Sequence, residues 1–249
     1  MRDKNRELVI NRKPGIIFNA NSLEFASLPR TDCHLHTCWT DGVGTCSEVY
    51  RTACEMKLDT ILFSEHSRKT STDWFNDFAS EVRGLPKSPC CAYVGTEVKV
   101  ETRQGDIDTT AEIQNNCDFM MASVHRLISP GGEVMPFDKV DPRDAVQAEF
   151  DLSLAVLENP AVDILGHMFG MSLRRFNQRI PDDKIRALIK KASHYKVAVE
   201  INSHYHANPL KMIDWCREFN ALISFGSNAH KLEDVGQITR CLDRAVKDA

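Results

Sequence analysis

The chain has 249 residues, a mass of 28.2 kDa and a formal net charge of -4 at pH 7. Hydrophobic residues make up 42% and charged residues 27% of the sequence, a globular composition that excludes a disordered or fibrous chain. The acidic balance argues against a protein that coats nucleic acid, and the apolar runs fall short of the roughly 20 residues that span a bilayer. Because the N-terminal residues do not resemble a secretory signal, we expect a cytoplasmic protein without a membrane partner.

Histidine and cysteine are both frequent, with nine of each. The number of cysteines is odd and no two of them form a CxxC pair, so we expect reduced and mostly buried thiols. Neither a disulfide framework nor a structural zinc ribbon has support. The histidines are therefore the feature that calls for a functional explanation.

We expect residues 1–28 to form an N-terminal extension and residues 29–249 to form one domain. In this domain short apolar runs alternate with amphipathic stretches. The expected strands are 30–36, 60–64, 92–98, 119–124, 162–165, 197–201 and 222–225, and the expected helices are 47–57, 74–83, 144–157, 182–195, 209–219 and 235–246. This alternation predicts parallel strands in an α/β fold. Seven strands favour a distorted (β/α)7 barrel over an open doubly wound sheet, which would show the same alternation.

Six of the seven expected strands carry a histidine or a glutamate at their C-terminal ends, where α/β barrels build their active sites. These residues are His34 and His36, His66, Glu97, His125, His167 and His230. Imidazole and carboxylate ligands suit zinc, manganese or iron. So many ligands imply more than one metal ion, and paired metals suit the hydrolysis of phosphoesters.

The first expected strand also predicts which side chains share a face. Alternate side chains of a strand lie on the same side, so Asp32, His34 and His36 are expected to point together into the barrel. Cys33 and Leu35 are expected to face the surrounding helices.

The motifs TDCHLHTxxxDG, SEH, GTE, SVH, GH and GSNAH, in this order, resemble those of the polymerase and histidinol phosphatase (PHP) family, from about Thr31 to His230. The resemblance implies a distorted seven-stranded barrel with a trinuclear metal site, in which a hydroxide between the first two metals attacks phosphorus. By position, it implies that the first metal is held by His34, His36 and Glu97, the second by Glu97, His125 and His167, and the third by Asp41, His66 and His230.

One position departs from the family pattern. The last motif usually reads GSDAH, and its Asp would bind the first metal, but this chain has Asn228. An amide offers its carbonyl oxygen without a charge, so that metal should bind more weakly, and the hydroxide loses a proton acceptor. Either Asn228 is natural and the activity is reduced or altered, or it is an engineered substitution that traps a ligand. We expect Asn228, Glu97 and Asp41 to be the catalytic residues.

Several basic residues follow the metal-binding motifs and are expected to contact the substrate. They are Arg68, Arg126, Arg174 and Arg175, to which we add His204. Arginine binds phosphate with two parallel hydrogen bonds. The alternative interpretation is that these charges are solvated on the rim.

Three functions fit these motifs. The compact domain and acidic charge favour hydrolysis of a phosphomonoester of a small metabolite, similar to histidinol phosphate or a nucleotide, with two or three divalent metal ions. The second is a phosphodiesterase or nuclease, with nucleic acid or oligonucleotides as the less favoured partner. The third is a metal-binding protein with weak or no catalysis, which Asn228 favours. The oligomeric state is not defined by the sequence.

Overall fold

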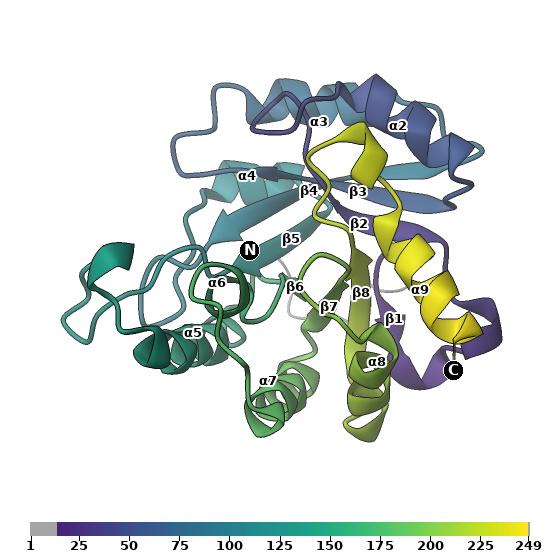
Figure 1. Cartoon of the computed structure of the whole chain (residues 1–249). Helices are drawn as coiled ribbons and strands as arrows, with labels where there is room; N and C mark the ends of the chain where they lie inside the picture. The colour runs from purple at the N-terminus through teal and green to yellow at the C-terminus, as the bar shows by residue number, and fades with distance from the viewer. Residues whose placement is uncertain (1–13, 249) are drawn as a thin grey trace.

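A computed structural model describes residues 14–248 and has one curled, mostly parallel sheet at its centre (Figure 1). The strands are β1 (Phe18–Asn19), β2 (Thr31–Leu35), β3 (Thr60–His66), β4 (Cys91–Lys99), β5 (Phe119–Ser123), β6 (Ile164–Leu165), β7 (Ala198–Asn202) and β8 (Leu222–Gly226). They lie in the order β1-β8-β7-β6-β5-β4-β3-β2. The seven strands from β2 to β8 are parallel, as expected, whereas β1 pairs antiparallel with β8. The sheet forms a half-barrel, which confirms the distorted α/β barrel.

The edge strand β2 and the strand β8, which lies next to the opposite edge strand β1, approach each other at their C-terminal ends. A parallel bridge joins Leu35 to Ala229. The backbone N–H of His36 donates to the carbonyl oxygen of Ala229 at 2.9 Å, and the N–H of Ala229 donates to that of His34 at 3.0 Å. The first and last metal-binding motifs are thereby brought side by side.

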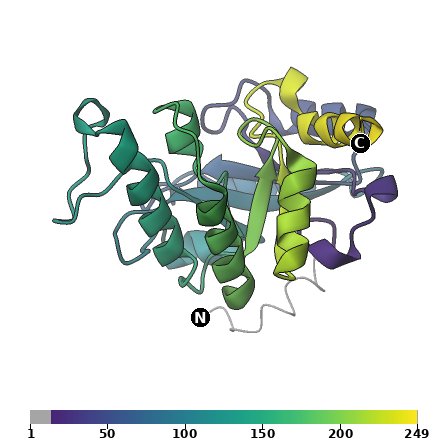
Figure 2. The ribbon, with the colours of Figure 1, turned by 60° about the horizontal axis from the view of Figure 1, so that its bottom comes forward.

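The helices cover the outside of the curled sheet. They are α2 (Cys46–Glu55), α3 (Phe75–Gly84), α4 (Ala111–Asn116), α5 (Pro142–Val156), α6 (Gly170–Arg174), α7 (Asp182–Tyr195), α8 (Pro209–Glu218) and α9 (Gln237–Lys247), with 3-10 turns at Ala20–Ser22, Phe25–Ser27, Phe137–Lys139 and Leu232–Asp234. Helices α2 and α3 lie above the sheet in Figure 1, and Figure 2 shows α5, α7 and α8 side by side. The six expected helices are present, and α4 and α6 are short additions. Within residues 14–248 no helix has both the length and the apolar character needed to cross a membrane.

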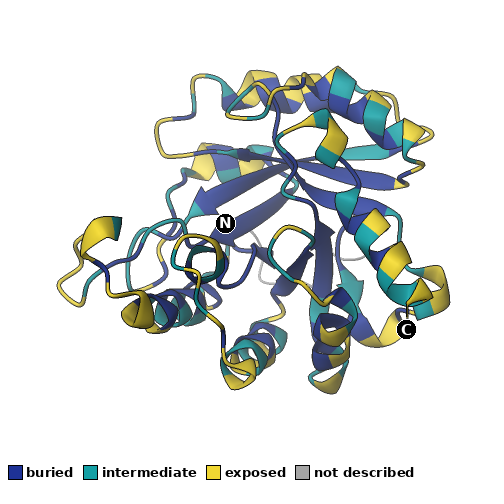
Figure 3. Ribbon diagram, in the orientation of Figure 1, coloured by how far each residue is buried: buried dark blue, intermediate teal, exposed yellow. Residues whose placement is uncertain are grey.

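The core has two layers, one on each side of the sheet. The strands are almost wholly buried, while the helices expose one face (Figure 3). The inner layer consists of Ile16, Ile17, Cys33, Leu62, Phe119, Met121, Ile164 and Ala198. Ile16 and Ile17 precede β1, so this part of the expected N-terminal extension helps to fill the barrel, while residues 1–13 of the extension lie outside the described residues. All nine cysteines are free thiols, and of these only Cys38 is exposed.

Strand β2 contains an irregularity that changes which side chains face the interior. Asp32 pairs with Ile61 and Leu35 pairs with Phe63, so β2 has one residue more than β3 over this stretch. Such a bulge interrupts the alternation of side chains. Cys33 therefore packs inside the barrel, and the carboxylate of Asp32 accepts hydrogen bonds from the backbone N–H groups of Ser227 and Gly236 at 2.9 and 2.8 Å. The expected orientations of Asp32 and Cys33 are wrong for this reason.

Candidate metal centre

Glu97 lies at the centre of the histidine cluster. It is on β4 with an exposed fraction of 1%. Its Oε1 atom lies 2.8 Å from Nε2 of His167 and 3.2 Å from Nε2 of His125. Its Oε2 atom lies 3.1 Å from Nδ1 of His66, 3.3 Å from Nε2 of His34 and 3.6 Å from Nε2 of His36. The structure thus gathers five of the expected histidine ligands around one carboxylate.

Asp41 gathers a second group of imidazoles at the mouth of the site. Its carboxylate lies 3.5 Å from Nε2 of His66, 3.4 Å from Nε2 of His230 and 3.9 Å from Nδ1 of His36. Hydrogen bonds from His230 and His66 hold the pKa of Asp41 well below its usual range. The side chain of Asp41 is half exposed, so this group is closer to solvent than the one around Glu97.

Two members of the cluster, Glu97 and His36, have the electrostatics that suit metal binding, whereas the carboxylates of Glu200 and Glu97 raise the pKa of His34 well above its ordinary value despite its burial. Burial alone would raise the pKa of Glu97, but the surrounding imidazoles, His125 and His34 foremost, hold it well below its usual range. Burial and the neighbouring rings of His34 and His66 lower the pKa of His36 well below its ordinary value. A carboxylate that stays ionised and an imidazole that stays neutral are the forms that bind metals.

Several buried polar atoms of the cluster make no hydrogen bond within the described residues. They are Nε2 of His34, Nδ1 of His36, Nδ1 of His66, Nδ1 of His167 and Oε2 of Glu97. Buried polar atoms without partners are costly and rare, so a cluster of them calls for an explanation. Divalent metal ions bound by these nitrogen and oxygen atoms would provide it, and the residues fit such ions.

The ligand atoms fall into three sets, each with all its atoms within 4.8 Å of one another. The sets are His36, Asp41, His66 and His230; His34, Glu97 and His167; and His66, Glu97 and His125. The expected grouping placed His34 and His36 on one metal, whereas here each lies in a different set. The assignment of ligands to individual ions stays a prediction.

Asn228 lies beside this cluster, in the turn after β8. Its backbone is left-handed, with φ of 52°, a conformation that Asn adopts more readily than most residues. Its Oδ1 atom lies 3.2 Å from Nε2 of His36, and its Nδ2 donates to the hydroxyl oxygen of Tyr205 at 3.2 Å. The carbonyl oxygen, the atom of the amide that can bind a metal, therefore faces the histidines.

Glu200 is a functional candidate that the sequence analysis missed. It is fully buried on β7, and its Oε1 lies 2.7 Å from Nδ1 of His34 and accepts from Nδ2 of Asn202 at 2.6 Å. Its Oε2 accepts from the backbone N–H of His167. A carboxylate that binds the second ring nitrogen of a metal ligand fixes the orientation of that ligand. One charged residue within the apolar run VAVEIN was the available signal.

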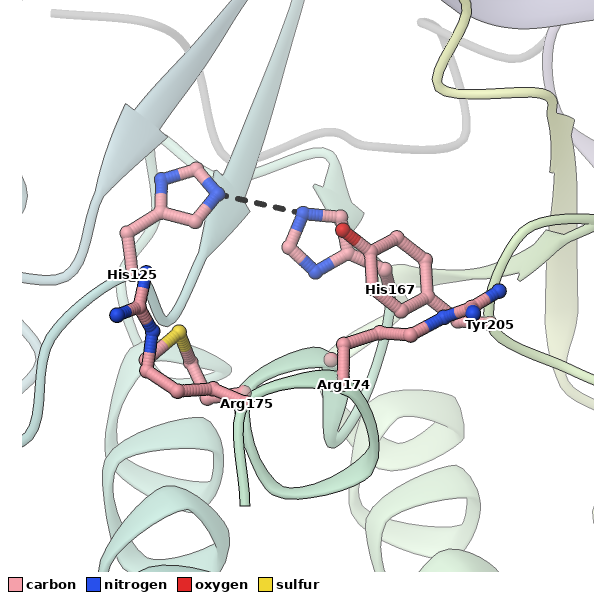
Figure 4. Close-up of a pocket in the computed structure, with 7 residues that line it drawn as sticks. His125, His167, Arg174, Arg175 and Tyr205 are labelled. Atoms are coloured by element: carbon pink, nitrogen blue, oxygen red, sulfur yellow. Dashed lines mark hydrogen bonds between the residues drawn. The ribbon is translucent and has the colours of Figure 1, made fainter. Parts of the chain in front are cut away.

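A pocket of about 420 Å³ opens next to the cluster (Figure 4). It is lined by His125, His167, Gly170, Met171, Arg174, Arg175 and Tyr205. Arg175 packs over the ring of Phe137 at 4.1 Å, and Arg174 lies 5.8 Å from the ring centre of Tyr205. Two cations and two histidines that are candidate metal ligands thus share one cavity. Tyr205, which the sequence analysis did not select, completes the wall, and burial raises its pKa to about 12.

The other expected substrate contacts lie outside this pocket. His204 is exposed, and its backbone carbonyl accepts a hydrogen bond from Arg174, while the next residue, Tyr205, lines the pocket. Arg68 is exposed and Arg126 is half-buried, near the end of β4. Whether these three side chains bind substrate stays a prediction.

The short helix α6, which ends at Arg174 and has Arg175 as its C-terminal cap, is fixed by a buried carboxylate from α5. Glu149 accepts from the backbone N–H groups of Met171 and Ser172 at 3.1 and 2.7 Å, and from the hydroxyl of Ser172 at 2.6 Å. Carboxylates at helix N-termini satisfy N–H groups that have no partner within the helix. Glu149 therefore sets the position of Arg174 and Arg175.

Parallel strands with candidate metal ligands at their C-terminal ends place this chain in the α/β barrel class of proteins. The model of the PHP domain family matches residues 32–204, and the chain belongs to this family. A relative from Vibrio campbellii, named "Probable phosphatase", is 25% identical over 236 residues, which cover 88% of this chain and 86% of the relative.

Two solved structures share the fold. A structure from Listeria monocytogenes aligns with a TM-score of 0.66 at 15% identity, covering 83% of this chain and 97% of that chain. The histidinol phosphate phosphatase of Lactococcus lactis, in complex with zinc, L-histidinol and phosphate, aligns with a TM-score of 0.61 at 15% identity. The alignment covers 88% of this chain and 94% of the chain from Lactococcus lactis.

Proposed function

We propose that this protein is a metal-dependent phosphatase that hydrolyses a phosphomonoester of a small metabolite. The observation that carries the proposal is the position of Glu97, whose carboxylate lies within 3.6 Å of five histidine nitrogens beside a pocket with two arginines. Membership of the PHP domain family and the phosphatase names of the relatives support it.

We further propose that two or three divalent ions of zinc, manganese or iron bind to the cluster. Their ligands are His34, His36, Asp41, His66, Glu97, His125, His167 and His230, with Asn228 as a neutral contributor. When bound, such ions neutralise charge on phosphoryl oxygens and lower the pKa of water. Glu200 holds the ring of His34 in one orientation, so the ligands are preorganised for the ions.

The pocket residues bind the substrate. Arg174 and Arg175 offer paired N–H donors to phosphate oxygens, and the ring of Tyr205 packs against the organic part of the substrate. A cavity of about 420 Å³ is within the range of small-molecule sites. This size favours a substrate similar to histidinol phosphate or a nucleotide over a polymer.

Two alternatives make different predictions. A phosphodiesterase would use the same metals on nucleic acid or oligonucleotides. A metal-binding protein with little catalysis is favoured by one observation, the neutral amide of Asn228 at 3.2 Å from His36.

A phosphate-release screen separates these functions. Purified protein is assayed with added manganese or zinc on phosphomonoesters, on bis-p-nitrophenyl phosphate and on short oligonucleotides. We expect turnover of monoesters, and its loss in Glu97→Gln. Turnover of diesters alone would reject the proposal, and no turnover even by Asn228→Asp would favour the metal-binding protein.

A further inference from the structure

Three basic residues follow three neighbouring metal-ligand positions at the mouth of the site. Arg68 stands two residues after His66, Lys99 two residues after Glu97, and Arg126 directly after His125. His66 and Glu97 are partners in the pairing of β3 with β4. Alternate residues of a strand share a face, so Lys99, the last residue of β4, extends from the same face as Glu97. We call Arg68, Lys99 and Arg126 the rim cations.

Asp108 connects the backbone segments that carry two of the rim cations. Its backbone N–H donates to the carbonyl oxygen of Lys99 at 3.0 Å, and its Oδ1 accepts from the backbone N–H of Lys69 at 3.0 Å. The turn that contains Arg68 is thereby tied to the end of β4. Two hydrogen bonds to one residue fix the relative position of these segments.

The pairing of three neighbouring strands places the rim cations close together. His66 pairs with Glu97, and Lys99 pairs with Ser123, so the three cations lie at or shortly after the adjacent ends of β3, β4 and β5. Within residues 14–248 none of the three forms an ion pair with a carboxylate, whereas the adjacent Lys69 pairs with Glu101. Like charges held together without a counter-ion cost free energy, which a bound anion would recover.

The rim cations lie outside the pocket that Arg174 and Arg175 line. The pocket is lined by Arg174 and Arg175 from α6 and its C-terminal cap, together with Tyr205, and none of the rim cations contributes to it. The rim cations follow β3, β4 and β5 instead. The metal cluster therefore has separate positive groups on two sides.

We propose that Arg68, Lys99 and Arg126 form a second anion subsite, and that the substrate is a phosphomonoester with a further anionic group, a carboxylate or a second phosphate. The scissile phosphate occupies the metal cluster and the second anion contacts the rim cations. This inference rests on the proposed phosphatase function and narrows its substrate class.

Two matched pairs of substrates test the subsite. Glycerol 3-phosphate is compared with 3-phosphoglycerate, and glucose 6-phosphate with glucose 1,6-bisphosphate, so that a carboxylate and a phosphate are tested separately. We expect the additional anion to raise kcat/KM about ten-fold through KM in at least one pair, since a charge-assisted hydrogen bond contributes at least that much.

Variants identify the residues responsible. Lys99→Gln should remove the preference for the additional anion, while kcat for glycerol 3-phosphate stays within about three-fold. Arg126→Gln should reduce the same preference. Lys69→Gln is the matched control, because it removes a neighbouring cation that is already paired with Glu101, and it should keep the preference.

The outcomes also separate this inference from the proposed function. Hydrolysis of all four esters without preference would reject the subsite and leave the phosphatase function intact. If the variants lose the same fraction of activity on both members of each substrate pair, the rim cations contact the scissile phosphate, and the second anion subsite is rejected. If no ester is hydrolysed, the affinities of the same four compounds are measured by calorimetry. Equal affinities within each pair would overturn the proposed subsite.

Discussion

The Oε1 atom of Glu200 lies 2.7 Å from Nδ1 of His34, and both side chains are fully buried. The second carboxylate oxygen of Glu200 accepts from the backbone N–H of His167. One residue outside the metal cluster therefore holds two of its expected ligands, His34 by its ring and His167 by its backbone.

Glu200→Gln should weaken metal binding by about ten-fold to a hundred-fold, the usual effect of removing a carboxylate that orients a ligand. Glutamine keeps the volume of the side chain but loses the charge that favours one orientation of the His34 ring. Competition with a coloured chelator measures the dissociation constant. Glu158→Gln, which removes an exposed carboxylate paired with Lys191, is the control. Unchanged metal affinity in Glu200→Gln, with an intact circular dichroism spectrum, would contradict the proposed role.

Asn228→Asp should increase both metal affinity and phosphatase activity, the latter by at least about ten-fold. The new carboxylate would bring a negative charge and a proton acceptor to the position 3.2 Å from His36. The hydroxyl of Tyr205 can then donate a hydrogen bond to it instead of accepting one. Steady-state kinetics with saturating manganese measure the effect.

Asn220→Asp is the matched control for this substitution. Asn220 has the same left-handed backbone, with φ of 49°, but its side chain binds Asn19 and Asn21 instead of the histidines. Equal activities of Asn228→Asp and the parent protein would show that Asn228 does not limit the site.

Glu149→Gln should change how stability depends on pH. Burial raises the pKa of Glu149 from its ordinary value of 4.5 to about 7. Between these values the unfolded chain releases the proton while the folded protein retains it, so the free energy of unfolding falls as pH rises. The stabilisation of the folded protein by protonated Glu149 is complete below pH 4.5 and is lost by about pH 7. It amounts to about 3 kcal/mol.

Urea unfolding at several pH values measures this dependence. Glu149→Gln has no titrating group at this position, so its free energy of unfolding should fall less steeply than that of the parent between pH 4.5 and 7. Parallel curves for the two proteins would show that Glu149 is not protonated in the folded state near neutral pH.

Removal of metal should destabilise the folded protein. The buried nitrogen atoms of His34, His36 and His66 that make no hydrogen bond would lose their partners. A ligand that binds only the folded state adds about 2.7 kcal/mol at a hundred-fold excess over its dissociation constant. Dialysis against a chelator should therefore lower the melting temperature, and added zinc or manganese should restore it.

Two histidine variants make this test specific. His66→Ala should reduce the stabilisation by added metal, because its ring contacts both Asp41 and Glu97. His194→Ala, which removes an exposed histidine on α7, should leave it unchanged. A similar metal response in parent and His66→Ala would argue against the cluster as the binding site.

The order of apolar runs and motifs along the chain was enough to predict the class of fold and the candidate ligands that gather in the cluster. Parallel strands separated by helices leave their C-terminal ends at one edge of the sheet, so residues such as His66, Glu97 and His125 had to meet there. The positions of these residues along the chain reveal this arrangement, because each candidate ligand directly follows the apolar run that forms its strand.

Features that depend on contacts between distant strands could not be predicted from the sequence and are seen in the folded structure. The bulge in β2 turned Cys33 inward and Asp32 toward Gly236, and it arises from pairing with β3. Glu200 and Tyr205 joined the site because β7 lies next to β8 in the sheet. Local sequence encodes the alternation of an ideal strand, but pairing partners and register are set by long-range packing, and these fix which side chains share the site.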